Sequence, residues 1–369
     1  MTGFLQGVVT TVLFFGILGL LVLIHELGHF VVARLAKVHV LEFGIGFPPR
    51  AKVLRSSGET LYTLNWLPIG GFVKLEGEDG DAKGDPRSFS AKSLPVRLTI
   101  LVAGVVMNIV LAFAIFAGIT WLASPLIGAT FAEVQADSPA AVAGLEGGDA
   151  IVAIDGQRFQ FLTGPNILET LRSKAGQHVV LTVDTPEGQR RDVEVTLRNP
   201  SQIDANHGAL GIAGIEGYFD GATATNDLPT AVRVGATETG RWMGLIVGGL
   251  GDLVASVAED PTAPPPVSGP IGIATQIGDV FFNAGPVMTL FVAGILSANL
   301  AVVNVLPFPP LDGGRMLMIT LKRIFGTRIT LRAEQLTYLV GFVFLFAFII
   351  WVSGFDLVRL FGGGSPASP

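Results

Sequence analysis

The stretch LVLIHELGHFVV, residues 21–32, places three ionisable side chains inside an apolar segment that carries no charge back to Gly3. An Asp, Lys or Arg inside a membrane span costs about 2.5–3.5 kcal/mol on insertion scales, so ionisable residues in such a segment predict a function. On a helix, His25 and His29 lie one turn apart on one face and can bind one zinc ion, while Glu26 can hold the proton of an attacking water. A surface charge cluster is the alternative, and the apolar surroundings disfavour it.

The composition is that of a polytopic membrane protein. Half of the 369 residues are apolar, only 15% are charged and the mean hydropathy is positive. The formal net charge of −6 argues against nucleic acid as a partner. Because there is no cysteine, disulfides, thiolate metal sites and cysteine nucleophiles are excluded, and a metal must use His, Asp or Glu. The N-terminal segment has no basic residue before Arg34, so we expect a retained span rather than a signal peptide.

Four segments are long and apolar enough to cross a bilayer at about 20 residues per span. They cover residues 4–36, 98–123, 281–305 and 335–354. The loops after the first and third segments are rich in Lys and Arg, so the positive-inside rule predicts that both are cytoplasmic. Both termini and the long region between the second and third spans are then extracytoplasmic. A glycine-rich, partly amphipathic stretch at 228–257 is predicted to lie at the membrane interface.

A catalytic zinc site usually has three protein ligands, so a third must come from elsewhere in the chain. The candidates are His39, His178, His207 and Asp312. Asp312, in NVLPFPPLDGGR at the cytoplasmic end of the third span, is the only acid between residues 279 and 334. The first and third spans run in the same direction, so Asp312 can meet the two span histidines. The alternative is a loop acid that caps a turn.

The long outer region begins with a β-rich module, in which the strands HVVLTVD and DVEVTLR follow a short helix and a glycine turn. This order resembles a PDZ domain of the circularly permuted bacterial type, and a small β domain that only packs is the alternative. The predicted organisation has five parts. They are an N-terminal membrane part at 1–126 with a β region at about 40–96, a PDZ-like domain at 127–200, a linker with an interfacial helix at 201–280, a C-terminal membrane part at 281–361, and a disordered tail at 362–369.

Two motifs together resemble the site-2 protease family of intramembrane zinc metalloproteases, in its bacterial, regulator-of-sigma-E branch. The first is HELGH, and the second is N-x-x-P-x-P-x-L-D-G-G, formed by Asn304, Pro307, Pro309, Leu311, Asp312, Gly313 and Gly314. The segments PIGGFVK at 68–74 and GPIGI at 269–273 extend the resemblance over nearly the whole chain. The chain departs from the family's A-G-P-x-x-N pattern, because Val105 replaces the proline between Gly104 and Asn108. Only one PDZ-like unit is evident.

The resemblance implies one Zn²⁺ per chain, held by His25, His29 and Asp312, with Glu26 as general base and then general acid. Asn304 would position the substrate or stabilise the oxyanion, and a helix-packing amide is an equal alternative. The implied substrates are transmembrane segments of single-pass proteins, such as anti-sigma factors or signal-peptide remnants, already trimmed by an upstream protease. The implied location is the bacterial inner membrane.

The resemblance also implies a β element that re-enters the membrane from the cytoplasmic side. Residues 61–66 and 72–75 are predicted to form a hairpin whose turn contains Gly70 and Gly71. The hairpin edge and Phe72 would bind the substrate as an added strand. An ordinary cytoplasmic hairpin is the alternative.

Two other functional classes are alternatives to a protease. One is a membrane scaffold in which the PDZ-like domain binds partners and zinc is a structural clasp, which predicts that Glu26 is dispensable. The other is a metal transporter with a site at mid-membrane, which the lack of evident inverted repeats disfavours.

Overall fold

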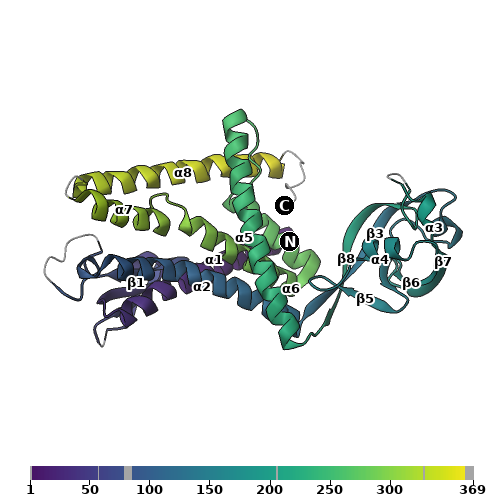
Figure 1. Ribbon diagram of the computed structural model, residues 1–369, viewed down its shortest axis with the longest axis horizontal. Coiled ribbons are helices and arrows are strands. Elements are labelled where there is room, and N and C mark those ends of the chain that lie inside the picture. The colour runs from purple at the N-terminus through teal and green to yellow at the C-terminus, as the bar shows by residue number, and fades with distance from the viewer. Residues whose placement is uncertain (1, 57, 79–84, 205–206, 327–328, 362–369) are drawn as a thin grey trace. The chain divides into compact units, whose positions relative to one another are not determined.

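Six helices form most of the membrane part of the chain (Figure 1). They are α1 (Thr2–Leu35), α2 (Leu94–Leu122), α5 (Leu228–Glu259), α6 (Pro270–Val305), α7 (Asp312–Phe325) and α8 (Leu331–Phe361). All but α7 are long and apolar enough to cross a membrane, which is one helix more than the four spans expected. The additional one is α5, whose hydropathy is the lowest of the five. The chain is a multi-pass membrane protein that also carries β-sheets.

The computed structural model describes residues 2–56, 58–78, 85–204, 207–326 and 329–361. The predicted tail at 362–369 lies outside these ranges. The chain divides into two compact units, one formed by Met1–Phe116 with Ala236–Pro369 and the other by Ala117–Gly235.

In the first unit, α1 and α6 pack against each other in the same direction. Near the start of both helices, a Cβ added at Gly278 would lie 2.3 Å from Thr10 Oγ1. Farther along both helices, His25 within α1 contacts Asp312, which begins α7 shortly after the end of α6. Small residues permit this close approach of membrane helices. The direction shared by the two helices is the one that the sequence predicted for the first and third spans.

The N-terminus of α6 is capped by a carboxylate from α8. Asp356 accepts hydrogen bonds from the backbone N–H groups of Gly269 (3.2 Å) and Gly272 (2.9 Å). These N–H groups have no partner within their own helix, so a buried acid satisfies them and favours the helix dipole. The cap explains why Asp356 occurs near the end of the largely apolar α8.

A small sheet follows α1 and consists of β1 (Val40–Arg55) and β2 (Leu61–Leu75). The predicted hairpin between residues 61–66 and 72–75 was wrong, because β1 lies between these two halves of β2. Phe43 is opposite both Tyr62 and Val73. The physical reason is that β1 offers both its edges, so each half of β2 pairs with β1 and not with the other half. The half that contains Val73 is therefore an edge strand.

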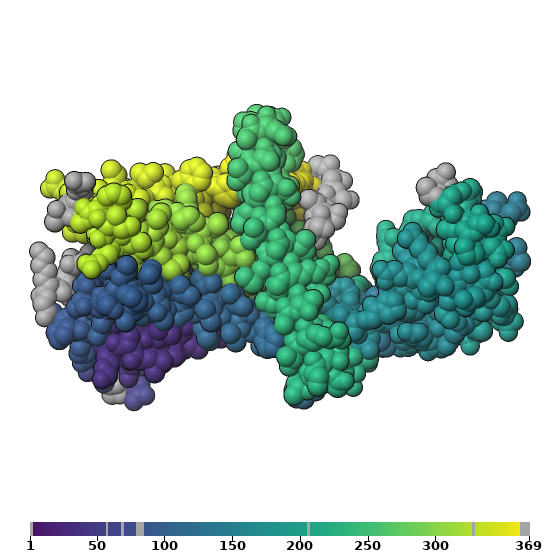
Figure 2. Space-filling model, in the orientation of Figure 1, coloured from purple at the N-terminus to yellow at the C-terminus, as the bar shows by residue number. Residues whose placement is uncertain are grey.

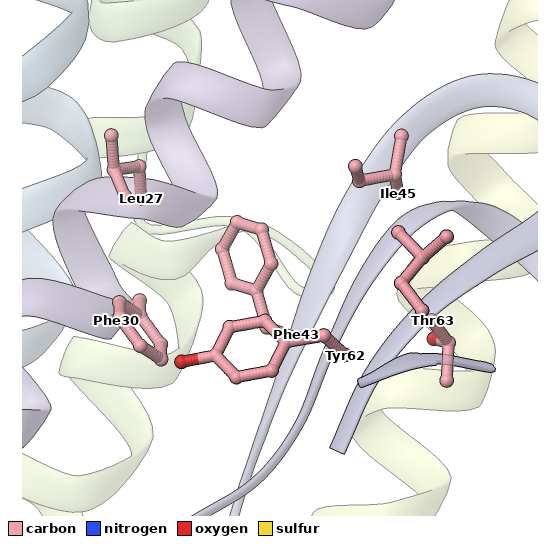
Figure 3. Close-up of a pocket in the computed structure, with 7 residues that line it drawn as sticks. Leu27, Phe30, Phe43, Ile45, Tyr62 and Thr63 are labelled. Carbon is pink, nitrogen blue, oxygen red and sulfur yellow. The ribbon is translucent and has the colours of Figure 1, made fainter. Parts of the chain in front are cut away.

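An aromatic cluster fixes the sheet against α1 (Figure 3). The ring of Phe30 lies 5.2 Å from the ring of Phe43 and 6.2 Å from that of Tyr62. These rings, with Leu27 and Ile45, line an apolar pocket of about 140 Å³. Because Leu27 and Phe30 face the sheet, the histidines of α1 face away from this pocket.

The second unit is a six-stranded antiparallel sheet with order β7-β6-β4-β5-β3-β8. Its strands and short helices are β3 (Ser124–Val134), α3 (Pro139–Val142), β4 (Ala150–Ile154), β5 (Gln157–Gln160), α4 (Ile167–Ser173), β6 (His178–Asp184), β7 (Arg190–Thr196) and β8 (Ile212–Ala224). The two predicted strands are β6 and β7. β8 pairs along β3 within the range expected to be a linker, because its glycines interrupt the alternating pattern that identifies a strand.

Candidate metal centre

His25, His29 and Asp312 form a buried cluster, with exposed fractions of 6%, 8% and 9%. Asp312 Oδ2 lies 2.9 Å from His25 Nε2 and 3.2 Å from His29 Nε2, and the two Nε2 atoms lie 3.1 Å apart. Ligands of a tetrahedral zinc ion at about 2.0–2.1 Å are separated by about 3.3 Å. Two imidazoles and a carboxylate that converge on one point therefore fit a zinc ion.

The second nitrogen of each imidazole is held by α2. His29 Nδ1 lies 2.8 Å from the carbonyl oxygen of Ile100, which can only accept, so Nδ1 carries the proton and Nε2 keeps its lone pair. The Asn108 amide lies 3.2 Å from His25 Nδ1. Asn108 Oδ1 is buried and has no hydrogen-bond partner among the residues that the structure describes. Rotating the amide by half a turn directs this oxygen at a protonated Nδ1. Both Nε2 atoms are then free to bind a metal.

Glycines allow α1 and α2 to approach closely enough for these contacts. A Cβ added at Gly104 of α2 would lie 2.5 Å from His29 Nε2 and 2.7 Å from His25 Nε2. On the other helix, a Cβ at Gly28 would lie 2.4 Å from the Ala103 carbonyl oxygen. The metal-binding atoms thus lie directly against the backbone of α2. This helix is continuous at Val105, where the family pattern has proline.

Asp312 reaches the histidines because α7 folds back on the proline-rich loop that follows α6. A Cβ at Gly313 would lie 2.1 Å from the Val305 carbonyl oxygen, and one at Gly314 would lie 2.5 Å from the Phe308 carbonyl carbon. Larger side chains would push the start of α7 away from α6. The two glycines of the LDGG motif therefore position the carboxylate that precedes them.

Glu26 lies beside this cluster and is held by the edge strand of the sheet. Its Oε2 accepts a hydrogen bond of 3.1 Å from the backbone N–H of Val73. Glu26 lines a cavity of about 180 Å³ together with His29 and Asp312, and Gly71 and Phe72 belong to the same lining. Of the predicted substrate-binding residues, Gly71 and Phe72 are thus at this cavity, whereas Gly70 is not part of its lining.

A buried ion pair forms another part of the cavity wall. Arg315 Nη2 of α7 lies 2.5 Å from Glu78 Oε1, and Glu78 Oε2 accepts from the backbone N–H of Leu75 at 3.2 Å. The pair connects α7, one turn after Asp312, to the end of β2. Sequence reasoning missed this pair, because neither residue carries a local signal that indicates its partner.

The remaining candidates form other contacts. The Asn304 side chain donates to the carbonyl oxygen of Leu300 on its own helix (2.9 Å), and no described hydrogen bond joins it to the cluster. His39 pairs with Glu76 at 2.6 Å, and the Glu76 carboxylate raises the pKa of that imidazole. His178 and His207 belong to the β-rich unit, where they lie beside acids of that unit.

Comparison with known proteins gives a consistent result over nearly the whole chain. The family model described as Peptidase family M50 matches residues 13–348. The chain is 33% identical over 341 residues to a Clostridium perfringens protein named "Putative zinc metalloprotease", which covers 92% of this chain and 95% of that protein. It is 27% identical over 427 residues to "Zinc metalloprotease RasP" of Geobacillus kaustophilus, covering 94% of this chain and 97% of that protein.

Proposed function

Because this chain belongs to peptidase family M50 and is a zinc metalloprotease of the site-2 type, we propose that it hydrolyses peptide bonds within transmembrane segments of single-pass proteins. The observation that carries the proposal is the buried cluster of two histidines and one carboxylate, whose histidines lie beside Glu26 on a helix apolar enough to cross a membrane. His25, His29 and Asp312 would hold the zinc ion. A soluble peptidase has no need to bury its catalytic residues in such helices.

When bound, zinc polarises the scissile carbonyl and activates the attacking water. Glu26 takes the proton of that water and passes it to the leaving amine. The free oxygen of Glu26, Oε1, makes no hydrogen bond within the described part of the chain, and Oε2 is held by Val73. Ile100 and Asn108 keep the imidazole protons on Nδ1, away from the metal. We assign Asn304 to substrate positioning, which requires its amide to leave Leu300.

The edge of β2 supports binding of the substrate as an added strand. A peptide bond in a membrane helix must leave its helical hydrogen bonds before it can be cut, and the freed groups need new partners. Val73 N–H and Leu75 N–H are directed away from β1 and are occupied by the carboxylates of Glu26 and Glu78. An incoming peptide would supply carbonyl oxygens to these donors. Glu26 would then be released to act as base at the moment when the substrate is paired.

The direction of the helices supports four spans. α1 and α6 run the same way, so the start of α6 lies on the same side of the membrane as the start of α1 and the end of α2. This direction supports an even number of crossings between α2 and α6. An α5 that lies at the membrane interface, rather than crossing once, fits this number and the low hydropathy of α5. The active site would face the cytoplasm, with both termini outside the bacterial inner membrane.

We further propose that the β-rich unit is a PDZ-like selector on the extracytoplasmic side. Such a domain can bind a chain terminus or exclude substrates by bulk. A substrate would be accepted after an upstream protease has removed most of its outer domain. Anti-sigma factors and signal-peptide remnants are of this kind.

The test is cleavage, in detergent, of a single-pass substrate with a shortened outer domain. We expect the wild type to cut it, to lose activity on chelation and to regain it with zinc, and we expect Glu26→Gln to be inactive while still binding zinc. Glu216→Gln, the same change at an exposed position of β8, is the matched control and should remain active. Equal cleavage by wild type and Glu26→Gln would disprove the role of Glu26. Stoichiometric zinc without cleavage of any such substrate would favour a scaffold.

A further inference from the structure

A second cavity of about 430 Å³ adjoins the one that contains Glu26. It is lined by α2, α7, α8 and the turn after β2, and Figure 2 shows the surfaces of α2 (blue), α7 (lime) and α8 (yellow) on the face in view. The two cavities share Glu78, Leu101 and Arg315 in their linings. A peptide that leaves the first cavity past these residues enters the second.

The charges that line this second cavity do not balance. The cations are Arg97, Arg315 and Lys322, and the acids are Glu78 and Glu334. Each acid already has a partner, because Glu78 pairs with Arg315 and Glu334 pairs with Lys322. Within the described ranges, Arg97 is therefore the cation of the cavity that forms no ion pair.

Arg97 is placed to receive an anion. It lies in the first turn of α2, which begins at Leu94, where the helix dipole favours negative charge. Its Nε is buried and has no hydrogen-bond partner among the described residues. A buried donor on a charged group is costly when it is left unpaired. The geometry thus indicates an anionic group that reaches Arg97 from the cavity.

The course of β2 identifies the source of that group as a peptide. Val73 and Leu75 line the first cavity, and Gly77 and Glu78 line the second. β2 ends at Leu75 and the chain turns at Gly77. An extended substrate that continues past this turn advances about 3.3 Å per residue, or about 13 Å in four residues. A substrate paired with β2 at the metal centre therefore directs its next residues toward Arg97.

We propose that the second cavity is a substrate subsite in which Arg97 binds the carboxylate of an Asp or Glu about three to five residues from the scissile bond. The inference rests on the proposed protease function and adds a residue that determines specificity. Membrane proteins usually carry Lys and Arg at their cytoplasmic flank, and a lysine in this subsite would face the unpaired Arg97. The subsite thus favours substrates with an acidic flank over the more common membrane proteins with a basic flank.

The test compares the purified wild-type enzyme and its variants. One single-pass substrate has a neutral flank, and two further series carry one Asp or one Lys at each of positions two to six on either side of the cut. The readout is the ratio of kcat/KM for Asp over Lys within each enzyme form, so a general loss of activity cancels. At one position we expect wild type to prefer Asp about tenfold, as suits a charge-assisted hydrogen bond. Arg97→Gln should abolish the preference and Arg97→Glu should reverse it, whereas Arg97→Lys should retain part of it. Arg323→Glu, the same charge change at an exposed position of α7, should behave as wild type.

The outcomes separate this inference from the function on which it rests. If wild type does not cut even the neutral substrate, the protease proposal fails and the subsite fails with it. If wild type cuts the neutral, Asp and Lys substrates equally at every position, the subsite alone is overturned. A preference that persists in Arg97→Glu also overturns it. The subsite is also overturned if the ratio of kcat/KM for Asp over Lys stays at one while phosphatidylglycerol in the vesicles changes the cleavage of all substrates alike. That result would assign the cavity to a lipid headgroup.

Discussion

Replacing Gly104 with alanine should prevent zinc binding while leaving α2, the helix that contains residue 104, intact. The new Cβ would lie 2.5 Å from His29 Nε2 and 2.7 Å from His25 Nε2. Heavy atoms in favourable contact are about 3.5 Å apart, so the imidazoles would have to move by about 0.8–1.0 Å. Metal–ligand distances are defined to about 0.2 Å. Because loss of an outer hydrogen bond alone costs 10–100-fold in metal affinity, we expect this displacement to cost more than about 100-fold.

The assay is the zinc content of detergent-purified protein, measured by mass spectrometry, together with cleavage of the single-pass substrate. Gly118→Ala is the matched control, because it lies on the same helix and a Cβ there meets nothing within 4 Å. Both changes gain about 0.8–1.0 kcal/mol of helix propensity, so the control should bind zinc and be at least as stable as wild type. A Gly104→Ala protein with one zinc ion per chain and normal cleavage would refute the geometry of the cluster.

Three further predictions follow from individual contacts. Asn108→Ala should lower zinc affinity about 10–100-fold, because it removes the group that orients the His25 ring. The measurement is equilibrium dialysis against a zinc chelator, and an unchanged affinity would contradict the prediction. Glu78→Gln should weaken zinc binding about tenfold, because Arg315, released from its ion pair with Glu78, then competes with zinc for the Asp312 carboxylate. A wild-type zinc affinity in the same measurement would contradict this. Hydrogen bonds from Arg190 hold the pKa of Asp184 below its usual value, so their contribution is full above a pH of about 3.9 and is lost as the pH falls through the lowered pKa. Arg190→Gln should therefore reduce the free energy of local opening of β6 and β7 by about 1 kcal/mol at pH 7 and by less near pH 3, as measured by hydrogen exchange. An equal loss at both pH values would rule out the ion pair between Arg190 and Asp184 as its cause.

The sequence predicted the elements whose residues carry a local signal. The apolar helices follow from composition and length, and β6 and β7 follow from alternation over HVVLTVD and DVEVTLR. β8 gave no such signal because glycines interrupt it, and the pairing of β2 was mispredicted because a distant edge of β1 was available. Register between segments depends on which edges meet in space, and periodicity along one segment does not contain that information.

The candidate site divides in the same way. By itself, the sequence determined that ionisable residues interrupt an apolar helix at metal-binding spacing and that Asp312 is the acid available to join them, because burial cost and helix periodicity are local properties. Only the tertiary structure decided that Gly104 and Asn108 lie against the imidazoles, that the edge of β2 holds Glu26, and that Arg97 forms no ion pair with a described residue. The physical reason is that these contacts join residues far apart in the chain. A glycine, an amide or an arginine has no distinctive pattern until packing determines what lies beside it.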